Sequence, residues 1–154
     1  MKTALTSRSV LALVALALLA WAFNSTSALG VQEASKKEKA IAVQYLEVVT
    51  PDVDATCAAW EKLHGVSFGK PEAALGNART ATLKGGGRVG VRAPMRKDEA
   101  PVIRPYVLVD DINAAVKAAE AAGGQIAMTA TEIPGQGKFA IYFLGGNQYG
   151  LWQL

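Results

Sequence analysis

Few side chains in this sequence could serve as nucleophiles or proton-transfer groups. The single histidine, His64, is followed by Gly65, which is typical of the end of a helix, and the single cysteine is Cys57. The spacing of Cys57 from Val53 and Trp60 predicts that it lies on the apolar face of the same helix. About two turns of helix separate Cys57 from His64, so the two side chains do not indicate a Cys–His catalytic pair.

Two pairs of aspartates resemble the paired carboxylates of acid–base sites. Asp52 and Asp54 stand at the start of one expected helix, and Asp110 and Asp111 stand at the start of another. At such positions a carboxylate accepts hydrogen bonds from the free backbone N–H groups of the first helical turn. We therefore interpret these aspartates as helix-capping residues rather than as catalytic acids.

The two aspartate pairs belong to an internal repeat. The segment from Tyr45 to Gly65 recurs fifty-nine residues later as the segment from Arg104 to Gly124. In each copy an apolar stretch precedes the acidic turn, a helical pattern follows it, and a glycine ends the helix. A duplication of this kind predicts a pseudo-symmetric fold whose functional surface lies where the two halves meet.

Hydrophobic periodicity extends the repeat to the whole chain after residue 40. In the first half it predicts a strand at 43–50, a helix at 51–65 and strands at 66–68, 78–84 and 88–92. In the second half it predicts a strand at 104–109, a helix at 111–122 and strands at 125–131, 138–144 and 148–153. Residues 94–101 form a polar linker, and the order βαβββ, linker, βαβββ predicts an α+β fold.

The first 28 residues have the composition of a secretory signal peptide. Two basic residues precede a charge-free apolar run at 10–23, and a small, polar stretch that ends at Ala28 follows it. This run is shorter than the roughly 20 residues that a helix needs to cross a bilayer. We therefore divide the chain into a signal peptide (1–28), a linker (29–40) and one domain (41–154), and expect a periplasmic or extracellular location. The alternative is a membrane anchor formed by residues 10–23.

Net charge and cysteine content argue against nucleic-acid binding, a disulfide and a thiolate metal cluster. Removal of the leader leaves fourteen basic and thirteen acidic residues, so the mature chain has a net charge of +1. This balance gives no basis for nucleic-acid binding. Because Cys57 is the only cysteine, the domain has no intramolecular disulfide and no thiolate metal cluster. An exported domain without a disulfide depends on packing or on association, and we expect a homodimer.

The order of the elements and four local motifs resemble the vicinal oxygen chelate (VOC) superfamily, which includes glyoxalase I, extradiol dioxygenases and the bleomycin- and fosfomycin-resistance proteins. The motifs are residues 47–52, 105–111, 134–140 and 146–153, and the resemblance covers the chain after residue 40. It implies that two βαβββ modules form one domain with a cup-shaped mixed sheet. In that superfamily the inner wall of the cup holds a divalent metal through His, Gln or Glu side chains.

The metal positions that this resemblance implies are held here by residues that do not suit a metal. They correspond to Tyr45, Arg104, Gly150 and a position at or near Gly90 or Val91. Tyrosine ligates a metal only when it is deprotonated, a guanidinium has no lone pair to give, and glycine has no side chain. We therefore expect no bound metal and no other cofactor.

Strand alternation instead predicts a pocket for an organic ligand in the cup. If residues at the metal positions face inward, so do their alternate neighbours, and the expected pocket residues are Tyr45, Glu47, Arg104, Tyr106 and Trp152. Aromatic walls beside two opposite charges would suit a small, partly aromatic or acidic ligand. In the alternative interpretation Glu47 and Arg104 neutralise each other as a buried ion pair, and the aromatic rings only fill the core.

Three classes of function remain open. The first is a metal-free protein that binds a small molecule outside the cytoplasm and meets the membrane only through an uncleaved N-terminal segment. The second is an enzyme with an unusual site, either a glyoxalase-like lyase or isomerase or a dioxygenase. The third is a structural or accessory subunit with a vestigial cup. Because the usual metal ligands are replaced, we favour the first class.

Overall fold

The computed structural model describes residues 40–154. The expected signal peptide at 1–28 and the linker up to residue 39 lie outside the described residues, so cleavage and export stay predictions. Among residues 40–154, no helix is both long enough and apolar enough to span a membrane.

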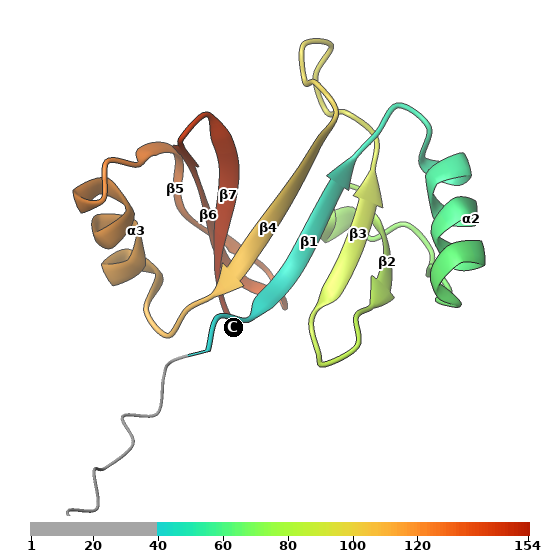
Figure 1. Ribbon diagram of the computed structural model, residues 1–154, viewed down its shortest axis with the longest axis horizontal. Helices are drawn as coiled ribbons and strands as arrows, with labels where there is room; N and C mark the ends of the chain where they lie inside the picture. Colours follow the sequence, from blue (N-terminus) through green and yellow to red (C-terminus); the bar gives the residue numbers. More distant parts are fainter. Residues whose placement is uncertain (1–39) are drawn as a thin grey trace, which may run out of the picture. The chain divides into compact units, whose positions relative to one another are not determined.

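Residues 40–154 form one mixed sheet of seven strands, with two α-helices packed on it (Figure 1). The first half contains β1 (Val43–Val49), α2 (Val53–His64), the short 3-10 helix η1 (Ala73–Leu75), β2 (Arg79–Thr82) and β3 (Arg88–Arg92). The second half contains β4 (Val102–Leu108), α3 (Ile112–Ala121), β5 (Gln125–Ile133), β6 (Gly137–Leu144) and β7 (Asn147–Gln153). The strand order is β2-β3-β1-β4-β7-β6-β5, which confirms the predicted α+β class.

The sheet repeats the duplication seen in the sequence. β1 pairs in parallel with β3, the last strand of its half, and β4 pairs in parallel with β7, the last strand of the second half. The two halves meet where β1 and β4 run antiparallel, with Tyr45 opposite Tyr106 and Glu47 opposite Arg104. The four inward-facing residues that the sequence indicates on these strands are therefore brought together at the centre of the sheet.

Both helices begin at the aspartates that the sequence indicates. Asp52 Oδ1 accepts a hydrogen bond from the backbone N–H of Ala55 at 3.0 Å. Asp111 Oδ1 accepts hydrogen bonds from the N–H groups of Asn113 and Ala114 at 2.9 and 3.1 Å. These bonds satisfy N–H groups that have no partner inside the helix. The capping interpretation is confirmed for these two residues.

The helices cover two separate apolar cores. The core beneath α2 is centred on Cys57, Val89 and Val91, and the core beneath α3 is centred on Ile112. Cys57 is 1% exposed, and its burial raises the pKa of the thiol. Since the helices occupy these outer surfaces, the inner surface of the sheet is left to form the cup.

The strand expected at 66–68 is absent. Val66 and Phe68 alternate with a polar residue, as in a strand, but both side chains pack into the core beneath α2. The backbone N–H of Phe68 donates to Glu61 Oε1 at 2.9 Å, and that of Gly69 donates to the carbonyl oxygen of Thr80 at 2.8 Å. These single bonds replace a strand ladder, so the first half has one strand fewer than the predicted βαβββ module.

Candidate functional site

The cup holds a cavity of about 470 Å³. Its wall is built from β1, β3, β4, β5, β6 and β7, together with η1 and the loop at 93–101, so both halves of the repeat contribute to it. The five predicted pocket residues all lie in the wall: Tyr45, Glu47, Arg104, Tyr106 and Trp152. The sequence interpretation missed several others, among them Arg92, Glu99, Phe139 and Gln148.

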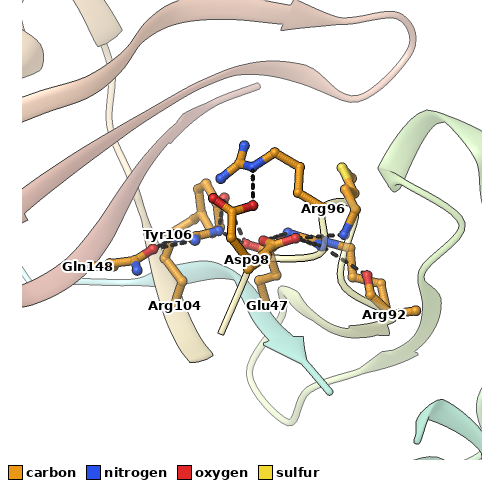
Figure 2. Close-up of polar contacts among 10 residues, drawn as sticks. Glu47, Arg92, Arg96, Asp98, Arg104, Tyr106 and Gln148 are labelled. Carbon is orange, nitrogen blue, oxygen red and sulfur yellow. Dashed lines mark hydrogen bonds and ion pairs between the residues drawn. The ribbon is translucent and has the colours of Figure 1, made fainter. Parts of the chain in front are cut away.

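Glu47 is the centre of a buried polar network in this wall (Figure 2). Glu47 Oε1 accepts a hydrogen bond from Arg92 Nε at 2.6 Å, and Oε2 accepts one from the Tyr106 hydroxyl at 3.0 Å. Arg104 Nη1 also donates to Glu47 Oε2, while Arg104 Nε donates to Gln148 Oε1 at 3.1 Å. The Glu47–Arg104 ion pair of the alternative interpretation is therefore present, and Arg92 adds a second guanidinium that the sequence reading did not foresee.

The network continues from Arg92 into the loop at 93–101. Arg92 Nη2 donates to Glu99 Oε1 at 2.7 Å, and Glu99 Oε2 accepts the backbone N–H of Met95 at 2.7 Å. The hydrogen bond from Arg92 lowers the pKa of Glu99 to about 2. Burial alone would lower the pKa of Arg92, but hydrogen bonds and charges from Glu99 and Glu47 outweigh it and raise that pKa. Arg92 and Glu99 are therefore both charged at neutral pH, and their ion pair fastens the loop to β3.

Aromatic rings form much of the apolar wall. The ring centroids of Tyr45, Tyr106 and Trp152 lie 5.4–5.8 Å apart, and that of Phe139 lies 6.2 Å from Tyr106. The indole N–H of Trp152 donates to the carbonyl oxygen of Gln136 at 3.1 Å. Because that N–H is already used, Trp152 offers a ligand an apolar surface rather than a hydrogen-bond donor.

Two tyrosines fill the space above two of the implied metal positions. The hydroxyl of Tyr45 lies where a side chain at Gly90 would begin, and the ring of Tyr106 lies where a side chain at Gly150 would begin. A Cβ atom at either glycine would overlap the tyrosine well inside van der Waals contact. Val91 is fully buried in the core beneath α2, so Gly90 rather than Val91 is the residue of β3 that faces the cup.

These residues do not fit the divalent metal that the fold family implies. Burial, followed by the negative charge of Glu47, raises the pKa of Tyr45 and of Tyr106, so both hydroxyls are protonated at neutral pH. Arg104 places a guanidinium at a third implied position. Within residues 40–154, no group of three or more His, Cys, Asp or Glu side chains is arranged to hold a metal ion.

Three other side chains that the sequence offered as possible catalytic groups, His64, Cys57 and Asp54, lie outside the cavity wall. His64 is exposed at the end of α2, with its ring centroid 5.2 Å from that of Trp60. Cys57 is buried in the core beneath the same helix, and Asp54 forms a surface ion pair with Arg79 at 3.1 Å. The chemistry of this site therefore rests on the polar network and the aromatic wall.

No family model and no curated protein matches this sequence. Solved structures do match its fold. A hypothetical protein from Bacillus halodurans C-125 has a TM-score of 0.60 at 11% identity, over 75% of this chain and 96% of that one. The methylmalonyl-CoA epimerase of Mycobacterium tuberculosis has a TM-score of 0.56 at 15% identity, over 72% and 86% of the two chains. A Streptomyces coelicolor methylmalonyl-CoA epimerase in complex with a nitronate-propionyl-CoA has a TM-score of 0.53 at 15% identity, over 72% and 95%. Because methylmalonyl-CoA epimerase is a VOC superfamily member, these matches confirm the predicted architecture, and residues 40–154 of this chain have the VOC fold.

Proposed function

We propose that this protein is an exported, metal-free binding protein that holds a small organic molecule in the cup between its two halves. The cavity itself is the observation that supports this most. Its volume of about 470 Å³ lies within the range of roughly 300–1,000 Å³ that is usual for small-molecule sites. Its wall also combines apolar and aromatic side chains with a few buried polar groups, which is the composition of such sites.

The open cavity favours a binding protein over a structural subunit with a vestigial cup. Protein interiors are close-packed, and unfilled apolar space lowers stability, so an unused cup would be expected to fill with side chains. Here Tyr45, Tyr106 and Trp152 pack against one another and still leave the cavity open beside them.

The polar network favours binding over catalysis. A general base must reach a substrate proton and have an oxygen free to accept it. Glu47 already accepts hydrogen bonds from Arg92, Arg104 and Tyr106, so it would have to leave two guanidinium groups to act in this way. The metal-dependent lyase and dioxygenase alternatives would in addition need ligands at positions that Tyr45, Arg104 and Gly150 occupy.

Export and dimer formation complete the proposal. Export rests on the composition of residues 1–28, with its basic start, apolar run and small-residue exit. Dimer formation rests on the cup, which is not fully enclosed and belongs to a single domain without a disulfide.

A fluorescence screen of the mature protein tests ligand binding. Only Trp60 and Trp152 remain once residues 1–28 are removed, and of these only Trp152 lines the cavity. A library of small aromatic fragments should therefore contain members that change the emission of the wild-type protein and of the Trp60→Phe control, but not of Trp152→Phe. If no fragment produces a change that depends on Trp152 at millimolar concentration, the proposed function is wrong.

A further inference from the structure

We infer that the cup selects an electrically neutral, flat molecule with a hydrogen-bond acceptor, and discriminates against both anions and cations of the same size. This inference rests on the proposed function and adds the chemical class of the ligand. It replaces the acidic ligand that the sequence alone allowed. The pairing of the charges in the cavity wall supports it.

The charged side chains of the wall balance one another. Three are arginines and three are carboxylates, namely Arg92, Arg96, Arg104, Glu47, Asp98 and Glu99. Each is ion-paired within this set. Glu47 pairs with Arg92 and Arg104, and Asp98 pairs with Arg96 (Figure 2). Glu99 pairs with Arg92. The wall therefore carries no net formal charge and leaves none of these six groups without a partner of opposite sign.

A charged ligand would have to break one of the buried pairs. Glu47, Arg92 and Arg104 are all buried, and a buried charge that loses its partner is far more costly than an exposed one. A ligand carboxylate that took Arg104 would leave Glu47 with Arg92 alone. A ligand cation that took Glu47 would leave Arg104 without a carboxylate. In both cases the free energy of the broken Glu47–Arg104 ion pair is lost, and this weakens binding of the charged ligand.

A neutral acceptor can bind without such a loss. A guanidinium has five N–H donors. Arg104 uses four of them on Glu47, Tyr106 and Gln148. Arg92 likewise uses four, on Glu47, Glu99 and the carbonyl oxygen of its neighbour. Among the contacts within residues 40–154, one Nη2 N–H on each arginine is left. These two donors match an amide, ketone or ether oxygen, which could bind while every ion pair stays intact.

The rest of the wall fits a flat apolar body. Rings of Tyr106, Phe139 and Trp152 lie in the wall, and the partly exposed Met128 and Phe143 extend its apolar surface. Aromatic faces favour stacked or edge-to-face contact with a planar ligand, and methionine adapts to varied shapes. The cup therefore combines two N–H donors, one on Arg92 and one on Arg104, with an apolar wall that suits a planar ligand.

Three probes that share one ring system test the inference: naphthamide, naphthoate and naphthamidine, which are neutral, anionic and cationic at neutral pH. Trp152 emission of the mature protein is titrated with each at low salt. Naphthamide should bind at least about tenfold more tightly than either ion, a difference of about 1.4 kcal/mol. Equal or tighter binding of naphthoate or naphthamidine would overturn the inference while leaving the proposed function intact. Failure of naphthamide to bind at millimolar concentration would also overturn it, whereas the proposed function falls only if the whole fragment library fails.

Two substitutions that each remove one negative charge test whether ion pairing in the wall causes the preference for a neutral ligand. Glu99→Gln removes a carboxylate whose side chain is 13% exposed and which pairs with Arg92, so the wall gains one positive charge and naphthoate should gain at least about tenfold relative to naphthamide. Asp54→Asn removes a carboxylate that lies outside the cavity wall and whose side chain is 92% exposed, so solvent and salt screen that change. Asp54→Asn should therefore leave the preference unchanged. An unchanged preference in Glu99→Gln, or the same shift in both variants, would contradict the inference.

Discussion

Arg104→Met should destabilise the domain strongly, because it removes one member of a buried charge network. The guanidinium of Arg104 donates to Glu47, Tyr106 and Gln148, and its side chain is 7% exposed. Methionine keeps an unbranched apolar stem of similar reach and adds no charge. The variant therefore tests the loss of the polar contacts more than a loss of packing.

The expected loss of unfolding free energy depends on the ion pair that Glu47 keeps in the variant. Removal of one partner from a buried ion pair costs roughly 3–5 kcal/mol. Glu47 keeps its ion pair with Arg92, so we expect the lower end, about 3 kcal/mol of unfolding free energy. For a domain of this size 1 kcal/mol corresponds to roughly 4 °C, so the melting temperature should fall by about 12 °C.

The assay is urea unfolding at neutral pH, followed by far-ultraviolet circular dichroism, on four variants of the mature protein. Glu47→Gln and Arg104→Met are measured singly and together, so that the double variant reports the coupling energy of the pair. The combination should recover at least about 1.5 kcal/mol relative to the sum of the single effects. Arg79→Met is the matched control. Arg79 pairs with Asp54, whose side chain is 92% exposed, so its loss should cost less than about 1 kcal/mol.

Two results would refute this reasoning. One is a loss in Arg104→Met as small as that in Arg79→Met, which would mean that solvent reaches the network. The other is additivity of the Glu47 and Arg104 substitutions. In either case Arg104 would be free to anchor an anionic ligand, which agrees with the acidic ligand that the sequence analysis allowed. Loss of ligand binding without loss of stability in Arg104→Met would support that role directly.

Four further predictions follow from the sequence and the fold. The purified mature protein should hold no stoichiometric divalent metal after dialysis; about one equivalent of Zn, Ni, Mn or Fe by elemental analysis would contradict this. Intact mass of protein from the native host should lack residues 1–28, and a mass that includes them would exclude cleavage near Ala28. Sedimentation at micromolar concentration should show a homodimer, and monomer alone would reject it. Gly150→Ala should destabilise the protein by about 1–3 kcal/mol in urea unfolding, because its Cβ would overlap the ring of Tyr106; an effect below about 0.5 kcal/mol would show that Tyr106 has room to move.

Much of the architecture could be predicted because the same local signals occur twice at a fixed spacing. The spacing between Asp52 and Asp111 matches two capping aspartates and two helices, although α2 has Gly65 as its C-cap and α3 has Ala122. Each local signal would be weak alone, but together they restrict the topology. The error at 66–68 has the opposite cause. Val66 and Phe68 have strand-like alternation, yet their side chains pack beneath α2 without a partner strand. Alternation predicts which side chains are buried but not whether the backbone pairs with another strand.

The cup could be predicted only in part, because alternation gives the facing of a residue but not its bonds. The inward facing of Arg92 was accessible in principle, since it lies two residues after Gly90 on β3 and therefore faces the same way. Glu99 offered no such signal. It lies in a loop without periodicity, and only the folded chain brings its carboxylate to Arg92.

The antiparallel register of β1 and β4 explains why the cup is polar and yet neutral. In sequence the repeat aligns Tyr45 with Arg104, and Glu47 with Tyr106, so each half carries one tyrosine and one charge of opposite sign. In the sheet the register reverses this order and sets tyrosine opposite tyrosine and glutamate opposite arginine. Each half alone would bury one of these charges without the other, and the two halves together bury a pair. The same contact that neutralises the wall of the cup therefore also ties the halves to each other, so a ligand that demanded either charge would weaken the junction that shapes its own site.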